Sequence, residues 1–322
     1  MRMLAVVTAM LAIACAAPDA FAQGYPTKPV RLVVGFAPGG AADTVARALG
    51  EQLGRALGQP IVIENRAGAG SSIAAENVAH SAPDGYSVLI ASPASISVNP
   101  ALNPKLNYKP TDLAPITKVS ASPLLLVVNP ATGITSVQDL IAAAKKDPDK
   151  LNYATSGVGS APHFGAVLFS QVTGIRMVHV PFKGGAPAVM SVVAGDTQVT
   201  FATPPSVLPM VKAGRLRALA VTKRDRSALM PDIPGMEEAG FPDYELSFWY
   251  GLFVPAGTPN EIIWKLYEAT AAAAQRPEVK AALAREGTEV SVSKSPHDFA
   301  EFLEQDEKFW VKLVKDTGAT AE

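Results

Sequence analysis

The stretch LVVGFAPGGAADTVARALG, residues 32–50, predicts a β-strand, a glycine-rich loop and an α-helix in direct succession. The helical part continues as one apolar stripe, because Val45, Leu49, Leu53 and Leu57 recur every four residues. Strand–loop–helix units of this kind build α/β folds, in which ligands bind where loops leave the carboxyl ends of parallel strands. The stretch therefore predicts both the fold class and the place of a first binding loop.

A weak internal repeat indicates that this unit occurs twice. The segment YATSGVGSAPHFGAVLFSQVTG starts about 118 positions after GFAPGG and has the same order of strand, glycine loop and helix. In both halves a second strand and glycine loop follow, and then a strand that ends in a polar residue and proline. These later pairs are IVIENRAGAG with MVHVPFKGGAP, and VLIASPAS with VTFATPPS. Three matched units in one order predict two similar lobes, although single βα units resemble one another in any α/β protein.

Strand-like and helical patterns alternate through the chain, which predicts an α/β fold with largely parallel sheets flanked by helices. The predicted strands are Val30–Phe36, Ile61–Glu64, Ser87–Ala91, Leu124–Val128, Leu151–Thr155, Met177–Pro181, Val199–Ala202 and Leu216–Thr222. The predicted helices beyond the first are Ser136–Lys146, Pro162–Thr173, Ala186–Ala194, Asn260–Gln275, Pro277–Glu286 and Pro296–Thr317.

Two extended apolar segments, Lys118–Val128 and Glu245–Val254, are candidates for the crossings between lobes and for a hinge. They predict a discontinuous first lobe, residues 23–122 and 250–322, and an inserted second lobe, residues 123–249. In the last predicted helix, Phe309 and Trp310 are expected to dock that helix onto the first lobe.

The first 22 residues have the features of a signal peptide, so we expect export and cleavage near Ala22. Arg2 supplies the positive start, Leu4 to Ala14 the apolar core, and Ala20-Phe21-Ala22 the cleavage motif. A second interpretation makes Cys15 the acylated residue of a lipoprotein leader. Because Cys15 is the one cysteine in the sequence, the chain forms no internal disulfide.

The composition argues against several functional classes. A net charge of −1 over 322 residues disfavours nucleic-acid binding, which usually uses a basic face. The sequence has no H-E-x-x-H motif and no P-loop lysine, and His80, His179 and His297 are scattered. We therefore expect no metal and no cofactor.

The loop of the first unit has the chemistry of an anion-binding site. Helix N-termini present unpaired backbone N–H groups and the positive end of the helix dipole. Gly39 and Gly40 keep side chains away from those groups. Asp43 is an unusual neighbour for an anion, so we interpret it as a residue that caps the helix or binds the loop amides. Taken alone, the loop is equally consistent with a plain turn.

The matching loop of the second half favours binding. The segment Thr155–Ser160 precedes a helix start at Ala161-Pro162, where proline is common. Two such loops on facing lobes suit a clamp around a small diacid, and Ser92, Thr203 and Ser206 add neutral hydroxyls on the third loops. Arg66 and Lys183 occupy the second loops, either to pair with a ligand carboxylate or as solvated charges.

Catalysis has weaker support in the sequence. The residues around Ser160 do not form a G-x-S-x-G elbow, and no carboxylate that would orient His163 is apparent from spacing. We interpret His163 as a helix cap or a pocket wall. A hydrolase that uses Ser160 and His163 is kept as an alternative.

Several segments of the sequence resemble those of a known protein family. YPTKPVRLVVGFAPGGAADTVAR, IVIENRAGAGSSIAAENVAHSAPDGYSVLIAS, YATSGVGSAPHF and VPFKGGAPAVMSVVAGDTQVTF resemble the Bug family, the periplasmic substrate-binding proteins of tripartite tricarboxylate transporters. The likeness extends to PDIPGMEEAGFPDYE and WYGLFVPAGTP and so covers the whole mature chain.

The resemblance implies a non-enzymatic, monomeric periplasmic receptor with a Venus-flytrap fold. Such a receptor binds a carboxylated ligand between its lobes through backbone amides, small hydroxyls and waters, and delivers it to large and small permease subunits. On the matching positions, the implied ligand-binding residues are Phe36, Pro38, Gly39, Gly40, Ala41, Asp43, Ser71, Ser92, Ser156, Gly157, Ser160, His163, Lys183, Gly184 and Thr203.

One departure from the family pattern bears on the ligand. FATPPS, residues 201–206, stands where many members carry an acidic or more polar stretch after the phenylalanine. Without an acidic group to neutralise an ammonium, the sequence favours a non-amino dicarboxylate or an aromatic carboxylate over an amino acid. A sensor that feeds a signalling partner instead of a transporter is the second functional hypothesis.

Overall fold

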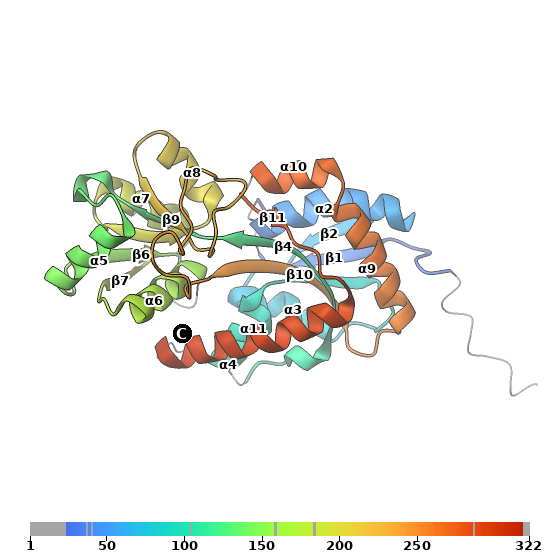
Figure 1. Ribbon diagram of the computed structural model, residues 1–322. Coiled ribbons are helices and arrows are strands. Elements are labelled where there is room, and N and C mark those ends of the chain that lie inside the picture. The colour runs from blue at the N-terminus through green and yellow to red at the C-terminus, as the bar shows by residue number, and fades with distance from the viewer. Residues whose placement is uncertain are drawn as a thin grey trace, which may run out of the picture.

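The computed structural model describes residues 24–36, 38–39, 41–103, 105–157, 160–182, 185–285 and 287–317. The chain forms two lobes, each built on its own β-sheet and flanked by helices (Figure 1). The predicted signal peptide, residues 1–22, and the candidate residues Gly40, Lys183 and Gly184 lie outside the described residues.

The first lobe contains a six-stranded sheet in the order β11-β4-β10-β3-β1-β2. Its strands are β1 Val30–Val34, β2 Ile61–Asn65, β3 Ser87–Ala91, β4 Leu113–Pro123, β10 Ser247–Pro255 and β11 Glu289–Val290. Its helices are α2 Ala41–Leu57, α3 Ser72–Ala79, α4 Asn99–Leu102, α9 Asn260–Ala274 and α10 Pro277–Arg285. The stripe predicted for α2 packs into the core, where Val45, Leu49 and Leu53 are almost fully buried.

The second lobe contains a five-stranded sheet in the order β7-β6-β8-β5-β9. Its strands are β5 Leu125–Val128, β6 Asn152–Thr155, β7 Val178–Pro181, β8 Val199–Ala202 and β9 Arg217–Val221. Its helices are α5 Val137–Lys146, α6 Ala161–Thr173, α7 Gly185–Ala194 and α8 Pro204–Lys212.

The predicted α/β class and the two lobes are confirmed. Parallel pairing holds among β1, β2 and β3 and among β6, β7 and β8, which are the strands that carry the repeated loops. The remaining strand pairs are antiparallel, so each sheet is more mixed than the sequence predicts. Every antiparallel pair includes β4, β10 or β5, the strand that directly follows β4, and none of these three strands belongs to the repeated units.

Strands β4 and β10 pair along their whole length and form a two-stranded ribbon between the lobes (Figure 1). The predicted crossing at Lys118–Val128 is divided, because β4 ends at Pro123 and β5 begins at Leu125. The domain boundaries at residues 122/123 and 249/250 stay a prediction. We refer to this ribbon as the hinge ribbon.

Helix α11, Pro296–Thr317, lies across both lobes (Figure 1). In its first half, Phe299 contacts Trp249 of β10 with ring centroids 5.7 Å apart. In its second half, Trp310 contacts Phe164 of α6 at 5.2 Å and Phe248 at 5.6 Å. The expectation that Trp310 docks onto the first lobe is therefore wrong. The helix is long enough to reach the second core, where Trp310 is buried.

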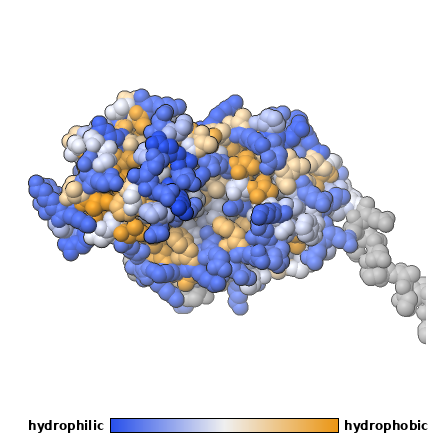
Figure 2. All heavy atoms as spheres, viewed as in Figure 1, coloured by the Kyte–Doolittle hydropathy of each residue, from blue (hydrophilic) through white to orange (hydrophobic). Residues whose placement is uncertain are grey.

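On the face drawn in Figure 2, hydrophilic residues cover most of both lobes and hydrophobic residues form separate patches. Along the part of the chain that the structure describes, no helix combines the length and apolarity needed to cross a membrane.

A cavity of about 400 Å³ lies beside the hinge ribbon under α11, and we call it the hinge-back cavity. Trp249, Trp310 and Asp306 line it, and the buried indole nitrogens lie close to the buried Asp306 carboxyl. Burial raises the pKa of Asp306 to about 6, although the two nearby indoles and the Lys118 ammonium act to lower it. The other charged residues that line this cavity are Lys118, Lys223, Glu245 and Glu289.

We expect protonation of Asp306 to stabilise the folded protein between about pH 4 and pH 6. The pKa of this carboxyl is near its ordinary value of 3.8 in the unfolded chain and about 6 in the folded one, so in this window the folded state binds more protons. The stabilisation is present at low pH and is lost as the pH rises through 6. Between pH 4.5 and 7.5 the loss amounts to roughly 2 kcal/mol. An Asp306→Asn variant should not show it.

The test compares the two proteins at each pH, because a buried histidine acts in the opposite direction. Burial, with a smaller effect of His179, lowers the pKa of His163 to about 4, so that this group destabilises the fold as the pH falls from 6.5 to 4. In urea unfolding, the free energy of unfolding of Asp306→Asn relative to that of the wild type should rise by about 2 kcal/mol between pH 4.5 and 7.5. A gap between the two proteins that does not change with pH would contradict the assignment.

Candidate functional site

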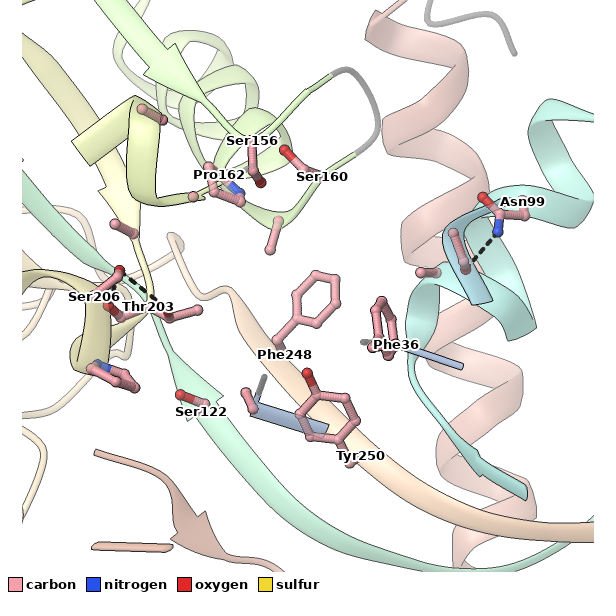
Figure 3. Close-up of a pocket in the computed structure, with 18 of the residues that line it drawn as sticks. Phe36, Asn99, Ser122, Ser156, Ser160, Pro162, Thr203, Ser206, Phe248 and Tyr250 are labelled. Atoms are coloured by element: carbon pink, nitrogen blue, oxygen red, sulfur yellow. Dashed lines mark hydrogen bonds between the residues drawn. The ribbon is translucent and has the colours of Figure 1, made fainter. Parts of the chain in front are cut away.

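A cavity of about 640 Å³ lies between the lobes, and residues of both lobes and of the hinge ribbon line it (Figure 3). Phe36 and Asn99 reach it from the first lobe, and Ser160 and Thr203 from the second. It is larger than the hinge-back cavity, and it occupies the place expected for a ligand between two lobes.

Among the described elements, five helices of eight or more residues begin at this cavity. The first residues of α2, α3, α6 and α7 line it, and so does Thr203, the residue before α8. Each start follows the carboxyl end of a strand, as the repeated strand–loop–helix units predict. Helix N-termini carry partial positive charge and unpaired N–H groups, so their convergence makes the cavity attractive to anions.

The described residues that line the cavity include no charged side chain. Their polar groups are hydroxyls and amides: Ser72, Asn99, Asn103, Ser122, Ser156, Ser160, Thr200, Thr203, Ser206, Tyr250 and Thr288. An anion held here would be stabilised by backbone dipoles and neutral donors, which act strongly in a site shielded from water.

Asp43, in the first turn of α2, binds the backbone of the preceding loop at Gly39. The Asp43 carboxylate accepts hydrogen bonds from Gly39 N at 2.9 Å, from Arg47 Nε at 2.8 Å and from Asn65 Nδ2 at 3.0 Å. The Arg47 hydrogen bond and the two others hold the pKa of Asp43 at about 2. The interpretation that Asp43 binds loop amides is confirmed. Gly39 itself has a φ of +81°, which glycine adopts without strain.

The loop before α3 has an unusual backbone. Gly68, Ala69, Gly70 and Ser71 all have positive φ, between 45° and 141°. Asn99 holds this loop, because its Nδ2 donates to Ala69 O at 3.1 Å, Gly70 O at 2.8 Å and Ser72 Oγ at 2.9 Å. Left-handed conformations cost free energy and persist where the surroundings enforce them, often at ligand sites.

In the second lobe, side chains organise the loop before α6. Thr155 Oγ1 contacts His179 Nε2 at 2.7 Å and accepts a hydrogen bond from Gly157 N at 3.2 Å. Ser160 is the residue before α6, as predicted, and its hydroxyl donates to Gly157 O at 2.6 Å. These contacts fix the described residues of this loop beside the cavity.

His163 does not line the cavity. It is buried and stacks on His179, with ring centroids 4.5 Å apart and planes 24° apart. With its pKa lowered to about 4, the imidazole is neutral at pH 7. Because the Ser160 hydroxyl donates its proton to a backbone carbonyl, the structure gives the Ser160–His163 hydrolase no support.

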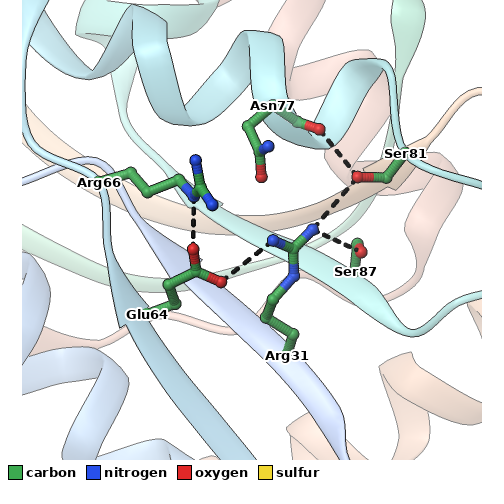
Figure 4. Close-up of polar contacts among 6 residues, drawn as sticks. All are labelled: Arg31, Glu64, Arg66, Asn77, Ser81 and Ser87. Atoms are coloured by element: carbon green, nitrogen blue, oxygen red, sulfur yellow. Dashed lines mark hydrogen bonds and ion pairs between the residues drawn. The ribbon is translucent and has the colours of Figure 1, made fainter.

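Arg66 does not face the cavity either. Figure 4 shows its guanidinium turned to Glu64, which also pairs with Arg31 across the sheet at 3.0 Å. Ser81 and Ser87 accept hydrogen bonds from the same Arg31. This network satisfies Glu64 and joins β1, β2 and β3, so Arg66 is a structural residue in this state.

The structure brings together only part of the predicted set. The residues that line the cavity are Phe36, Ala41, Ser156, Ser160 and Thr203. Those that lie in or behind the loops without lining it are Pro38, Gly39, Asp43, Ser71, Ser92, Gly157 and His163. Gly40, Lys183 and Gly184 lie outside the described residues. Their roles as ligand contacts all stay predictions.

Four residues that the sequence does not predict also line the cavity: Asn99, Ser122, Phe248 and Tyr250. Phe248 and Tyr250 alternate with Trp249 in a predicted crossing strand. Because alternate residues of a strand share a face, this pattern could have indicated that Phe248 and Tyr250 lie on the same side. Nothing near Asn99 in the sequence indicates that it reaches a loop about 30 residues earlier.

Among the described residues, no group of three or more histidine, cysteine, aspartate or glutamate side chains is placed to hold a metal ion. The expectation of a site without metal stays a prediction.

Comparisons with known proteins place this geometry in context. Residues 45–319 match the family model described as tripartite tricarboxylate transporter family receptor. Protein BugT of Bordetella pertussis is 37% identical over 320 residues, which cover 99% of this chain and 98% of BugT.

Two solved structures with bound acids are similar along almost their entire length. R. palustris Rpa4515 with adipate is 35% identical, with a TM-score of 0.81 over 91% of this chain and 98% of that one. MatC (Rpa3494) from Rhodopseudomonas palustris with bound malate is 31% identical, with a TM-score of 0.76 over 90% of this chain and 100% of that one.

Proposed function

The chain belongs to the tripartite tricarboxylate transporter family of receptors, and on this premise we propose that it captures a small carboxylated organic acid between its lobes and delivers it to membrane permease subunits. The family consists of periplasmic solute-binding proteins and not of enzymes. Export through cleavage of residues 1–22 is part of the proposal, since the leader lies outside the described residues.

The observation that carries the ligand class is the convergence of five helix N-termini on a cavity without a charged described side chain. A carboxylate would accept hydrogen bonds from the unpaired backbone N–H groups and from hydroxyls such as Ser156. A cationic ligand would meet the positive ends of the helix dipoles and find no described carboxylate to pair with. Two relatives that bind adipate and malate give independent support.

Delivery requires that ligand binding favour one arrangement of the lobes. The hinge ribbon is the natural place for this motion, because β4 and β10 connect the two sheets. A ligand that contacts loops of both lobes binds the closed arrangement better and shifts the population towards it. Permease subunits would then recognise the closed form.

A panel of mono-, di- and tricarboxylates, aliphatic and aromatic, tests the proposal by thermal shift. A ligand present at about 100 times its dissociation constant should stabilise the folded chain by about 2.7 kcal/mol. The uncharged amides of the same acids are the matched controls and should give no shift. A panel in which no acid raises the melting temperature would contradict the proposal.

The sensor hypothesis shares the ligand and differs in the partner. Transport predicts that cells lacking this protein lose uptake of the bound acid and regain it when the protein is restored together with the permease subunits. Unchanged uptake, with a lost transcriptional response to the acid, would favour the sensor.

A further inference from the structure

We propose that Phe36, Phe248 and Tyr250 are specificity-determining residues that select a carboxylate carrying an aromatic ring. This inference rests on the proposed function and narrows it to one of the two ligand classes that the sequence leaves open. The three rings would contact the hydrocarbon part of the ligand, whereas the helix N-termini would bind its carboxylates.

The three rings come from different parts of the molecule to one region of the cavity. Phe36 follows β1 in the first lobe, whereas Phe248 and Tyr250 lie two residues apart on β10 and so share one face of the hinge ribbon. Figure 3 shows the rings grouped between Thr203 and Ser206 on one side and Asn99 on the other.

These rings are unpartnered towards the cavity. Among the ring contacts of the described residues, Phe36 and Tyr250 make none, and Phe248 contacts Trp310 alone. Most other aromatic side chains of the cores are paired, for example Phe169 with Phe201 and Trp249 with Phe299. Aromatic rings gain from edge-to-face or offset contacts with a further ring, so two rings without a ring contact and a third with only one fit a ring of the ligand between them.

Phe248 is held in position from behind. Its ring meets Trp310 of α11 edge-on at 5.6 Å, and Trp310 in turn meets Phe164 at 5.2 Å. Trp310 and Phe164 are buried, so they limit the movement of Phe248 away from the cavity. A preorganised ring costs less ordering entropy on binding than a mobile one.

Tyr250 adds a neutral donor to this group. Burial raises the pKa of its phenol to about 12, so that the hydroxyl keeps its proton at pH 7. None of the hydrogen bonds among described residues uses this hydroxyl, and Figure 3 shows it directed between the rings of Phe248 and Phe36. It is therefore available to a carboxylate or ring substituent of the ligand.

Two matched pairs of acids test the inference by titration calorimetry. The pairs are benzoate with cyclohexanecarboxylate, and benzene-1,4-dicarboxylate with trans-cyclohexane-1,4-dicarboxylate. Within a pair, the carboxylates and the size of the ring are kept and aromaticity changes. We expect the wild type to bind the aromatic member of at least one pair about tenfold more tightly than its saturated partner.

Variants assign the preference to the rings. Phe248→Leu and Tyr250→Leu should each reduce the aromatic preference to about threefold or less, whereas Tyr250→Phe keeps the ring and should keep the preference. Phe309→Leu changes a partly exposed ring of α11 that does not line the cavity between the lobes, and it should leave the preference unchanged. Thermal unfolding of every variant checks that a lost preference is not a lost fold.

The possible outcomes separate this inference from the proposed function. Equal or tighter binding of the saturated acids, or a preference that survives both leucine variants, would overturn the role of the rings. If hexanedioate or another acid of the wider panel binds and no ring-bearing acid does, the inference also fails and the proposed function stands. If no carboxylate binds at all, both fail.

Discussion

The Gly35→Ala variant is expected to fold but to lose at least about 100-fold in affinity for the acid that the wild type binds best. A methyl group at Gly35 would lie 1.7 Å from Ser71 Oγ and 2.9 Å from Ser71 Cα. The second of these distances involves the backbone, so rotation of the Ser71 side chain does not relieve it. The loop before α3 must therefore move.

This loop cannot move without changing the binding cavity. Ala69, Gly70 and Ser72 line the cavity, and Asn99 holds all three through the hydrogen bonds of its Nδ2. A shift of the loop would misplace the amides at the start of α3. Loss of one or two hydrogen bonds to a charged group costs roughly 3 kcal/mol, which corresponds to about 100-fold in affinity.

A second substitution distinguishes this mechanism from general damage. Ser71→Gly removes the Oγ and Cβ atoms nearest the new methyl group and suits the positive φ of 75° at this position. The Gly35→Ala/Ser71→Gly double variant should therefore recover part of the affinity. Gly24→Ala, where a methyl group meets nothing closer than 3.4 Å, is the control. Unchanged binding in Gly35→Ala would show that the loop does not take part.

The sequence predicts the fold well because periodic patterns report it directly. The stripe of Val45, Leu49, Leu53 and Leu57 marks α2, and the limits of β3 and β8 agree with the structure to the residue. Helix α8 was not predicted, because Pro204, Pro205 and Pro209 are typical of a turn. The first two prolines occupy the first turn of α8, where their missing N–H groups cost nothing.

The candidate site was harder to predict, because it is assembled from residues far apart in the chain. The glycine loops were found, since glycine and a helix start together indicate an exposed backbone. No sequence pattern indicates the direction in which a side chain points. Ser71 points to Gly35, Arg66 to Glu64 and His163 to His179. The grouping of Phe36 with Phe248 depends on the hinge ribbon and needs tertiary structure.

The second large effect is expected for Trp310→Ala, which should reduce the free energy of unfolding by about 3–5 kcal/mol. Trp310 is 1% exposed and contacts Phe164 and Phe248, so truncation leaves a cavity in the second core. Phe309, the next residue on α11, is 36% exposed, and Phe309→Ala should cost less than about 1 kcal/mol. Urea unfolding followed by circular dichroism measures both values.

The Trp310 substitution should also change how the lobes unfold, because α11 connects their cores. Its first half is bound to the hinge ribbon through Phe299 and Phe302, and its second half reaches the other core through Trp310, Leu313 and Val314. Without the indole, the lobes share fewer buried contacts and should lose cooperativity. Calorimetry should then show a broader or divided transition for Trp310→Ala and a single one for Phe309→Ala. A single, unbroadened transition in Trp310→Ala would show that the hinge ribbon alone couples the lobes.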